Sequence, residues 1–311
     1  MDFLIGGVAA AGASVFSNPL DVLKTRMQLQ GELKAKGQHA VHYRNVFHAA
    51  VVVVKHDGVL GLQKGLGPAL VMHCVRNTIR LGGYQWLNNN GYLSNRENGK
   101  TIFVNSFIAS AFCGAAGAFF GSPLFLIKTQ LQSQAAKNIA VGFQHGHSNA
   151  IGALKEIYNN HGINGLWRGC TGTMIRALAG SSAQLASFAQ AKEHLAEYKI
   201  FRDYSILNSL VSSIIGGVFQ CLLMQPFDLV SVRLYNQGVD ASGKGLLYEG
   251  INDCFIKIFK SEGIAGFYKG VTANYMRLAP HGALCLVFWD ILKDLQIQYV
   301  GTNPKLNNSN S

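Results

Sequence analysis

Three matched stretches decide the fold: Pro19-Leu20-Asp21-Val22-Leu23-Lys24, Pro123-Leu124-Phe125-Leu126-Ile127-Lys128 and Pro226-Phe227-Asp228-Leu229-Val230-Ser231. Their prolines are 104 and 103 residues apart. A glycine follows each proline after 39, 39 and 37 residues, and a second glycine, preceded by a basic residue, lies seven residues further on. The recurrence of three anchors in three places indicates a tandem triplication of a unit of about a hundred residues.

Each unit contains two segments that are apolar enough to span a membrane. The units cover residues 1–97, 98–200 and 201–300, and a polar tail follows at 301–311. The uncharged segments 3–20, 101–127 and 204–227 are long enough to cross a hydrocarbon core as helices, which takes roughly 20 residues. A polar loop with a short amphipathic segment follows, and the second glycine then opens another apolar helix. We therefore expect an all-α membrane protein: six transmembrane helices in a pseudo-threefold bundle, with short helices at one end.

The composition agrees with a membrane protein that has one basic side. Only 14% of the 311 residues are charged and 49% are hydrophobic, whereas a soluble domain carries about 25% charged residues. The net charge is nevertheless +11. The loops 24–64, 128–168 and 231–269 hold 16 basic and 7 acidic residues, as expected for the side that the positive-inside bias selects.

The cysteines and histidines show no metal-site spacing. The six cysteines are scattered singly through the chain, so we expect no metal and no disulfide framework. His145 and His147 stand in a Gly- and polar-rich stretch without a nearby acidic residue in the sequence, and we interpret them as solvated loop residues.

Four arginines interrupt the second apolar helices. Arg76 and Arg80 are four residues apart and share a helix face, and Arg176 and Arg277 each lie seven residues after the glycine that opens their helix. An arginine at mid-membrane costs about 2.5–3.5 kcal/mol, so these side chains should face a water-filled cavity. Guanidinium groups grip carboxylate, sulfate or phosphate, and Gln184 adds a hydrogen-bonding group two turns beyond Arg176. The alternative is that the arginines pair with acids elsewhere in the chain.

The triplicated strings Pro-x-(Asp/Glu)-x-x-(Lys/Arg), (Asp/Glu)-Gly and aromatic-(Lys/Arg)-Gly resemble the mitochondrial carrier family over residues 1–299. Within that family, residues 183–192 and 277–281 are similar to the oxoglutarate, dicarboxylate and oxaloacetate carriers, and most of all to the branch of solute carrier 25 members 34 and 35. The resemblance implies a multi-pass protein of the mitochondrial inner membrane. Its central substrate site would open alternately through a matrix gate and a cytoplasmic gate.

The resemblance also implies how the matrix gate is built. The acidic residue of one odd-numbered helix would pair with the basic residue of the next, which gives Asp21 with Lys128, Asp228 with Lys24, and Phe125 with Ser231. The third pair cannot be ionic. Both departures fall in one pair, which looks like replacement of a whole interaction, because a lone buried charge would be costly. A gate with two ion pairs should open more easily than one with three.

The cytoplasmic gate and the accessory positions are less complete. The family string aromatic-(Asp/Glu)-x-x-(Lys/Arg) is intact only where it supplies Asp290 and Lys293, and Gln85 with Lys192 is the one contact expected from cyclic pairing. Two further expectations concern accessory residues. Gln28 and Gln132 are expected to brace the gate pairs, and the alternative is that they are ordinary polar residues at helix ends. The turns at Gly65, Gly169 and Gly270 are expected to hold a lipid phosphate, and the resemblance implies that the lipid is cardiolipin.

These features predict a secondary transporter of small dicarboxylates or inorganic oxyanions, such as oxaloacetate, malate, malonate or sulfate. An uncoupling-type conductance for protons or fatty-acid anions through the same cavity is the alternative. We expect a monomer without a cofactor. A soluble nucleic-acid-binding protein would need exposed basic patches with stacking aromatics, and long uncharged segments argue against it. No nucleophile–base pair or metal-ligand set supports an enzyme.

Overall fold

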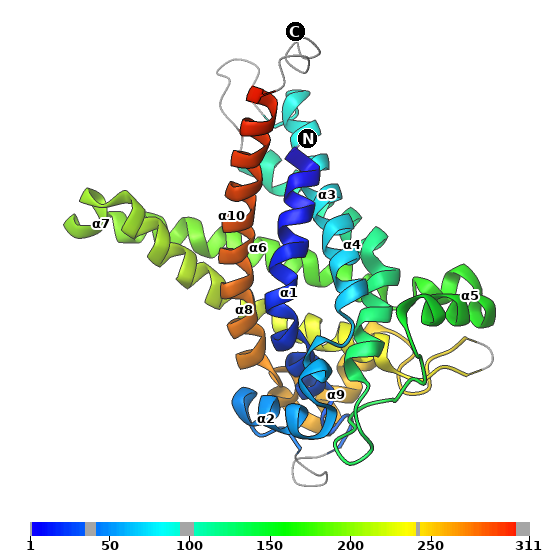
Figure 1. Cartoon of the computed structure of the whole chain (residues 1–311). Coiled ribbons are helices and arrows are strands. Elements are labelled where there is room, and N and C mark those ends of the chain that lie inside the picture. Colours follow the sequence, from blue (N-terminus) through cyan, green and yellow to red (C-terminus); the bar gives the residue numbers. More distant parts are fainter. Residues whose placement is uncertain (1, 35–41, 94–102, 241–242, 303–311) are drawn as a thin grey trace.

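A computed structural model describes residues 2–34, 42–93, 103–240 and 243–302 of the chain (Figure 1). Its six long helices are α1 (Asp2–Leu29), α3 (Leu66–Asn89), α4 (Phe103–Ser133), α6 (Cys170–Ala196), α8 (Ser205–Asn236) and α10 (Val271–Thr302). The shorter elements are α2 (Val46–Asp57), η1 (Val59–Gln63), α5 (Ala150–Leu166), α7 (Lys199–Asp203) and α9 (Ile251–Phe267). The predicted all-α class is confirmed, and each predicted unit contributes two long helices and a shorter one between them.

The conserved spacing of the prolines corresponds to a shared position inside the odd helices of the three repeats. Pro19, Pro123 and Pro226 lie within α1, α4 and α8, and each helix continues for about ten residues beyond its proline. The apolar segments predicted from the sequence end close to each proline, whereas the helices in the structure continue through this more polar extension. It carries the buried side chains that join one repeat to the next. We call this end of the bundle, where α2 and α9 also lie, the proline end.

The even helices begin at glycines because the neighbouring repeat approaches closely there. Gly65, Gly169 and Gly270 have φ values of +71°, +81° and +75°, which side chains rarely adopt. A Cβ on Gly65 would lie 3.0 Å from the backbone oxygen of Lys128, and one on Gly169 would lie 3.3 Å from the ring of Tyr235. Each even helix therefore starts packed against the odd helix of another repeat.

An apolar stripe on α4 faces outward. Val104, Ile108 and Phe112 follow one another at four-residue spacing and are 59%, 60% and 72% exposed, which is expected of a surface covered by lipid. Among the described helices, α4 and α8 are apolar enough to span a membrane by composition alone, with a mean hydropathy of 1.6 over Val104–Ser133 and Leu207–Asn236. The other long helices carry more polar residues because several of them line the cavity described below.

The bundle is tight at the proline end and departs from threefold symmetry at the other. Figure 1 shows α1, α3, α4 and α10 running side by side, whereas the hairpin of α6 and α8 leans away with α7 at its tip. Near the proline end α8 still bonds to α10, since Asn274 donates to Gln225 (2.9 Å) and Gln225 donates to the backbone oxygen of Lys269 (2.7 Å). The arrangement closes one end and leaves the other open.

Candidate functional site

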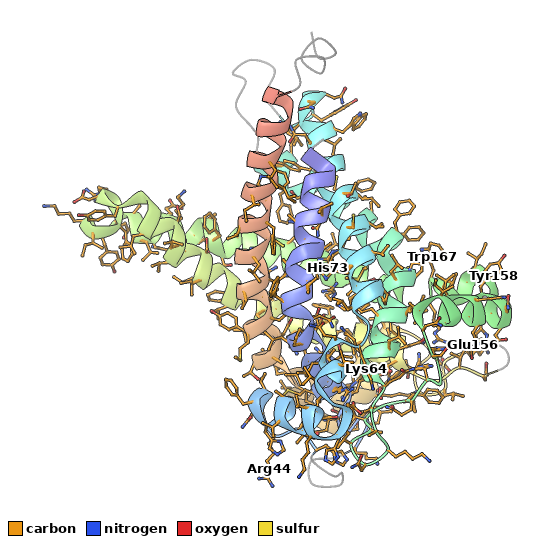
Figure 2. The ribbon with its side chains drawn as sticks, in the orientation of Figure 1. Arg44, Lys64, His73, Glu156, Tyr158 and Trp167 are labelled. Atoms are coloured by element: carbon orange, nitrogen blue, oxygen red, sulfur yellow. The ribbon has the colours of Figure 1, made fainter. Side chains whose placement is uncertain are left out.

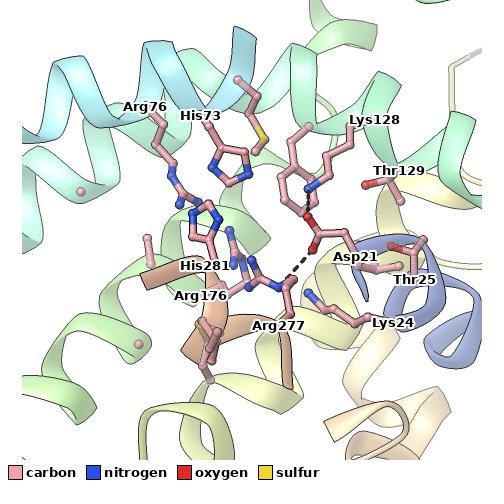
Figure 3. A pocket seen from close by; sticks show the side chains of 18 of the residues that line it. Asp21, Lys24, Thr25, His73, Arg76, Lys128, Thr129, Arg176, Arg277 and His281 are labelled. Atoms are coloured by element: carbon pink, nitrogen blue, oxygen red, sulfur yellow. Dashed lines mark hydrogen bonds and ion pairs between the residues drawn. The ribbon is translucent and has the colours of Figure 1, made fainter. Parts of the chain in front are cut away.

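A cavity of about 130 Å³ lies in the middle of the bundle (Figure 3). Residues of α1, α3, α4, α6, α8 and α10 line it, so all three repeats contribute. The basic residues that line it are Lys24, Arg76, Arg80, Lys128, Arg176 and Arg277. Asp21 lines it as well, and Asp228 lies directly behind Lys24. With six basic and two acidic groups, the site carries a net charge of about +4.

Both ion pairs expected between the odd helices are present. Lys128 Nζ lies 2.9 Å from Asp21 Oδ2, and Lys24 Nζ lies 2.6 Å from Asp228 Oδ2. All four side chains are at most 6% exposed. Breaking a pair buried to this degree by removing one partner is strongly destabilising, so the two pairs hold α1 against α4 and against α8.

The same two aspartates also bind two of the cavity arginines. Arg277 Nε lies 3.0 Å from Asp21 Oδ1, and Arg176 lies 3.5 Å from Asp228 Oδ1. Pairing with acids, the alternative weighed for the arginines, therefore holds for these two. Within the described part of the chain, Arg76 and Arg80 have no carboxylate within ion-pair distance. Arg80 lines the cavity and is exposed.

The third gate position is filled by an aromatic cluster. The Phe125 ring lies 5.2 Å from the ring of Tyr235, and the Arg176 guanidinium lies over Phe125 at 5.3 Å. Ser231 donates instead to the backbone oxygen of Phe227 (2.7 Å) in its own helix. Phe125 thus interacts with the cavity arginine rather than with Ser231.

The two glutamines expected to brace the gate differ in the contacts they make. Gln28 donates to Asp228 Oδ2 (2.8 Å) and so contacts the ion pair of Lys24. Gln132 does not reach the pair of Lys128; it accepts from Thr25 (3.0 Å) and donates to Asn18 (3.0 Å) on α1. The expected brace contact of Gln132 is therefore wrong, although its side chain still joins α4 to α1.

The expected contact between Gln85 and Lys192 is absent from this structure. Gln85 donates to Asn89 (3.1 Å) in its own helix, and Lys192 lies over the ring of Phe188 at 5.8 Å. The reason is the outward lean of α6, which also leaves Gln184 exposed and outside the cavity lining. Two further gate residues belong to α10, but their side chains lie outside the described residues: Asp290 and Lys293.

The cavity contains two histidines that the sequence reading missed. His73 is 2% exposed, and neither of its ring nitrogens has a hydrogen-bond partner. Its ring lies 5.1 Å from that of His281, whose Nδ1 is 3.0 Å from Ser17 Oγ. The sequence spacing could have identified both histidines as cavity residues. His73 is three residues before Arg76 and His281 is four residues after Arg277, so each histidine shares a helix face with a cavity arginine.

Below the cavity, repeats 1 and 3 each contain a buried cluster that we call an acid–base brace. In repeat 1, Asp57 binds Arg26 (2.7 Å) and Lys64 (3.6 Å). In repeat 3, Glu262 binds Arg233 (2.9 Å) and Lys269 (2.6 Å). Burial favours the neutral acid, but hydrogen bonds and charge from the arginines outweigh it and hold the pKa of Asp57 and Glu262 below their ordinary values.

In repeat 2, hydrogen bonds of glutamine and histidine side chains take the place of the brace. Gln130 takes the arginine position and donates to the backbone oxygen of Tyr235 (3.2 Å). His147 lies 3.1 Å from Gln130 Oε1 and 2.9 Å from Glu156. Figure 2 shows Glu156 on α5. His145 lies 2.9 Å from the backbone oxygen of Asn236. The interpretation of these two histidines as solvated loop residues is therefore wrong, because the loop folds back against α5 and α8.

Six long helices in three repeats around a central cavity lined by basic side chains define a membrane carrier. The chain belongs to the mitochondrial carrier family: the model "Mitochondrial carrier protein" matches residues 1–93, 99–199 and 202–300. It is therefore a multi-pass protein of the mitochondrial inner membrane and not an enzyme.

Three relatives narrow the comparison. The chain is 50% identical over 295 residues to human solute carrier family 25 member 35, which covers 95% of this chain and 98% of the relative. It is 36% identical over 299 residues to the mitochondrial oxaloacetate transport protein of Schizosaccharomyces pombe (96% and 91% covered). It is also 36% identical over 310 residues to the mitochondrial citrate transporter E of Aspergillus niger (98% and 97% covered).

Proposed function

We propose that this carrier moves small dicarboxylates or inorganic oxyanions, such as oxaloacetate, malate, malonate or sulfate, through the central cavity by alternating access. The observation that carries the proposal is the surplus of basic groups, with Arg76 and Arg80 lacking a carboxylate partner among the described residues. The cavity volume of about 130 Å³ has room for several water molecules and therefore for a small anion. The relationship to an oxaloacetate transport protein supports the same substrate class.

Substrate binding would also act on the ion pairs at the proline end. Asp21 is shared between Lys128 and Arg277, and Asp228 is shared between Lys24 and Arg176. A dianion that binds the two arginines competes with the aspartates for them. The substrate therefore interacts differently with the closed and open states, which a ligand must do to shift a conformational equilibrium.

We assign the proline end to the matrix side, where the aspartate–lysine pairs form the matrix gate. Gln85, Lys192, Asp290 and Lys293 would form the cytoplasmic gate in the opposite state. Bound cardiolipin at the helix starts of Gly65, Gly169 and Gly270 and a monomeric protein complete the proposal. Backbone N–H groups at helix N-termini favour a phosphate group.

Transport in liposomes tests the substrate class. Purified protein is reconstituted, and uptake of labelled oxaloacetate, malate, malonate, sulfate and oxoglutarate is measured with and without internal anion. Arg277→Ala and Arg76→Ala should each reduce uptake at least tenfold, because a charge-assisted hydrogen bond to the anion contributes about 1.5–3 kcal/mol. Lys155→Ala, on the exposed face of α5, should leave uptake unchanged.

Two results would contradict the proposal. Full uptake by Arg277→Ala and Arg76→Ala would place the substrate elsewhere. Proton conductance without anion uptake would favour the uncoupling-type alternative, and it is measured in the same vesicles with a pH-sensitive dye.

A further inference from the structure

The three repeats place different residues at one equivalent position, four residues before a glycine on the short helix of each repeat. A Cβ on that glycine would lie 2.5 Å from the Cβ of the residue in question in all three repeats, so the local backbone is the same. The residues at this position are Asp57, His161 and Glu262. Repeat 2 therefore lacks the carboxylate at the centre of the acid–base brace.

The basic residue that faces this position is kept in all three repeats. Lys64 donates to the backbone oxygen of Gln134 (3.0 Å), Lys269 donates to that of Gln30 (3.0 Å), and Arg168 lies 3.4 Å from that of Gln237. The three acceptors are themselves equivalent by the repeat. Lys64 and Lys269 also bind a carboxylate, whereas Arg168 has none within ion-pair distance in the described part of the chain. Its Nε is buried without a hydrogen-bond partner.

A cavity of about 140 Å³ lies in front of Arg168. Its polar walls include Gln130, His145, His147 and His161, and Val239 of repeat 3 closes one side. Val239 lies two residues after Gln237, as Ala136 lies two residues after Gln134, and Ala136 donates its backbone N–H to the brace acid Asp57 (3.0 Å). In the loop of repeat 1 the N–H of Leu33, three residues after Gln30, donates to Glu262 (2.9 Å). The cavity thus occupies the space that a carboxylate would fill.

We propose that this cavity is a second anion site, which binds the phosphate or carboxylate group of a small anion between Arg168 and His161. The bound anion takes the place of the missing acid and completes the third brace. Glu156 also lines the cavity, but it is engaged by His147 (2.9 Å) and its side chain is 58% exposed, so it does not neutralise Arg168. Arginine binds oxyanions through two parallel N–H groups, and an imidazole N–H supplies a further donor.

Occupation of this site has a predicted effect on transport as well. A completed brace joins α5 to the loop after α8, and this contact must separate when the proline end opens. Binding of the anion from the matrix side therefore favours the closed proline end. The site lies outside the central cavity, so it can be filled while the substrate site is empty.

The test measures binding of radiolabelled inorganic phosphate to the purified full-length protein in detergent by equilibrium dialysis. The central cavity binds some phosphate in every variant, so the difference from the unaltered protein is what is read. His161→Glu and Arg168→Gln should lose the same increment of binding, and Lys155→Gln should lose none. His161→Glu should also raise the apparent unfolding temperature in phosphate-free buffer, because the new carboxylate pairs with Arg168, whereas Arg168→Gln should not.

The outcomes distinguish free phosphate from lipid phosphate as the bound group, and they distinguish failure of the second anion site from failure of the proposed transport function. The same increment seen only after cardiolipin is added identifies the bound group as a lipid phosphate at this site. Unchanged phosphate binding in Arg168→Gln, with or without cardiolipin, overturns the proposal even if His161→Glu does not fold. A lack of anion uptake in liposomes would contradict the transport function and leave this binding difference intact.

Discussion

Repeat 2 differs from repeats 1 and 3 at the proline end, both in the ion pairs between the odd helices and in the acid–base brace. Repeats 1 and 3 contribute an aspartate to the ion pairs between odd helices and an acid to the brace below. At the two equivalent positions repeat 2 has Phe125 and His161. The one ion pair that joins repeat 2 to repeat 3 in the described residues is the 3.5 Å contact of Arg176 with Asp228, which lies in the cavity.

The difference shows how a triplicated chain can keep its packing and change its energetics. Gln130 retains the hydrogen bond to the next repeat that Arg26 and Arg233 make, each to an equivalent backbone oxygen. The geometry of the three boundaries is therefore similar, but one of them lacks buried ion pairs at the proline end. Because removal of both partners of a buried pair is far less costly than removal of one, repeat 2 tolerates the change.

The largest expected effect comes from breaking a complete brace. Glu262→Gln leaves Arg233, which is 0% exposed, without its carboxylate and should cost about 3–5 kcal/mol of unfolding free energy. The equivalent change in repeat 2, His161→Gln, should cost less than about 1 kcal/mol, since no ion pair is lost there. Thermal unfolding of the purified proteins in detergent measures both. Equal losses in the two variants would remove the distinction between the repeats.

A smaller effect is expected from acid, and it should appear in repeat 2 first. Burial lowers the pKa of His145 to about 4, although its hydrogen bond to the Asn236 oxygen opposes the shift. A histidine whose pKa is lower in the folded state contributes stability that is complete above its ordinary value of 6.5 and is lost as the pH falls toward 4. The loss amounts to about 3 kcal/mol at most.

The braces of repeats 1 and 3 should withstand the same acidification. The pKa values of Asp57 and Glu262 are held below normal, so their contribution is present above the ordinary carboxyl pKa and is lost only as the pH falls below it. After division by the intrinsic exchange rate at each pH, hydrogen exchange in residues 134–149 should therefore increase from pH 7 to pH 5 before it increases around α2 and α9. His145→Gln should flatten this dependence. An unchanged pH profile in that variant would show that another group is responsible.

The sequence alone predicts the fold and most of the cavity, because both repeat regularly. The prolines, the helix-opening glycines and the matched positions of Arg176 and Arg277 are set by spacing within each unit. The ion pairs of Asp21 and Asp228 follow from the family pattern, and the structure contains them. That each aspartate also binds a cavity arginine was not predictable, because this contact depends on the positions of Arg277 on α10 and Arg176 on α6 along the bundle.

Contacts that differ among the three repeats could not be predicted from the repeated sequence pattern. The outward lean of α6 separates Gln85 from Lys192, and no residue in the sequence around Gln85 or Lys192 predicts this lean. The loop that carries His145 and His147 looks solvated in sequence, and it is buried only because α5 supplies Glu156 and α8 supplies a free carbonyl. A comparison of the units position by position would have identified His161 as a missing acid.

The smallest effect tests whether the neutral position in repeat 2 controls the rate of opening. Phe125→Asp combined with Ser231→Lys supplies the third ion pair between odd helices that the pattern of the other two predicts. The added pair stabilises the closed proline end by about 1–2 kcal/mol, so exchange in liposomes should slow by about five- to thirtyfold while substrate preference stays the same. Phe125→Asp alone provides the control, because its unpaired carboxylate would instead compete with Asp228 for Arg176 and should lower protein stability. If the double variant exchanges as fast as the unaltered carrier, the rate is limited by a step other than separation of the odd helices.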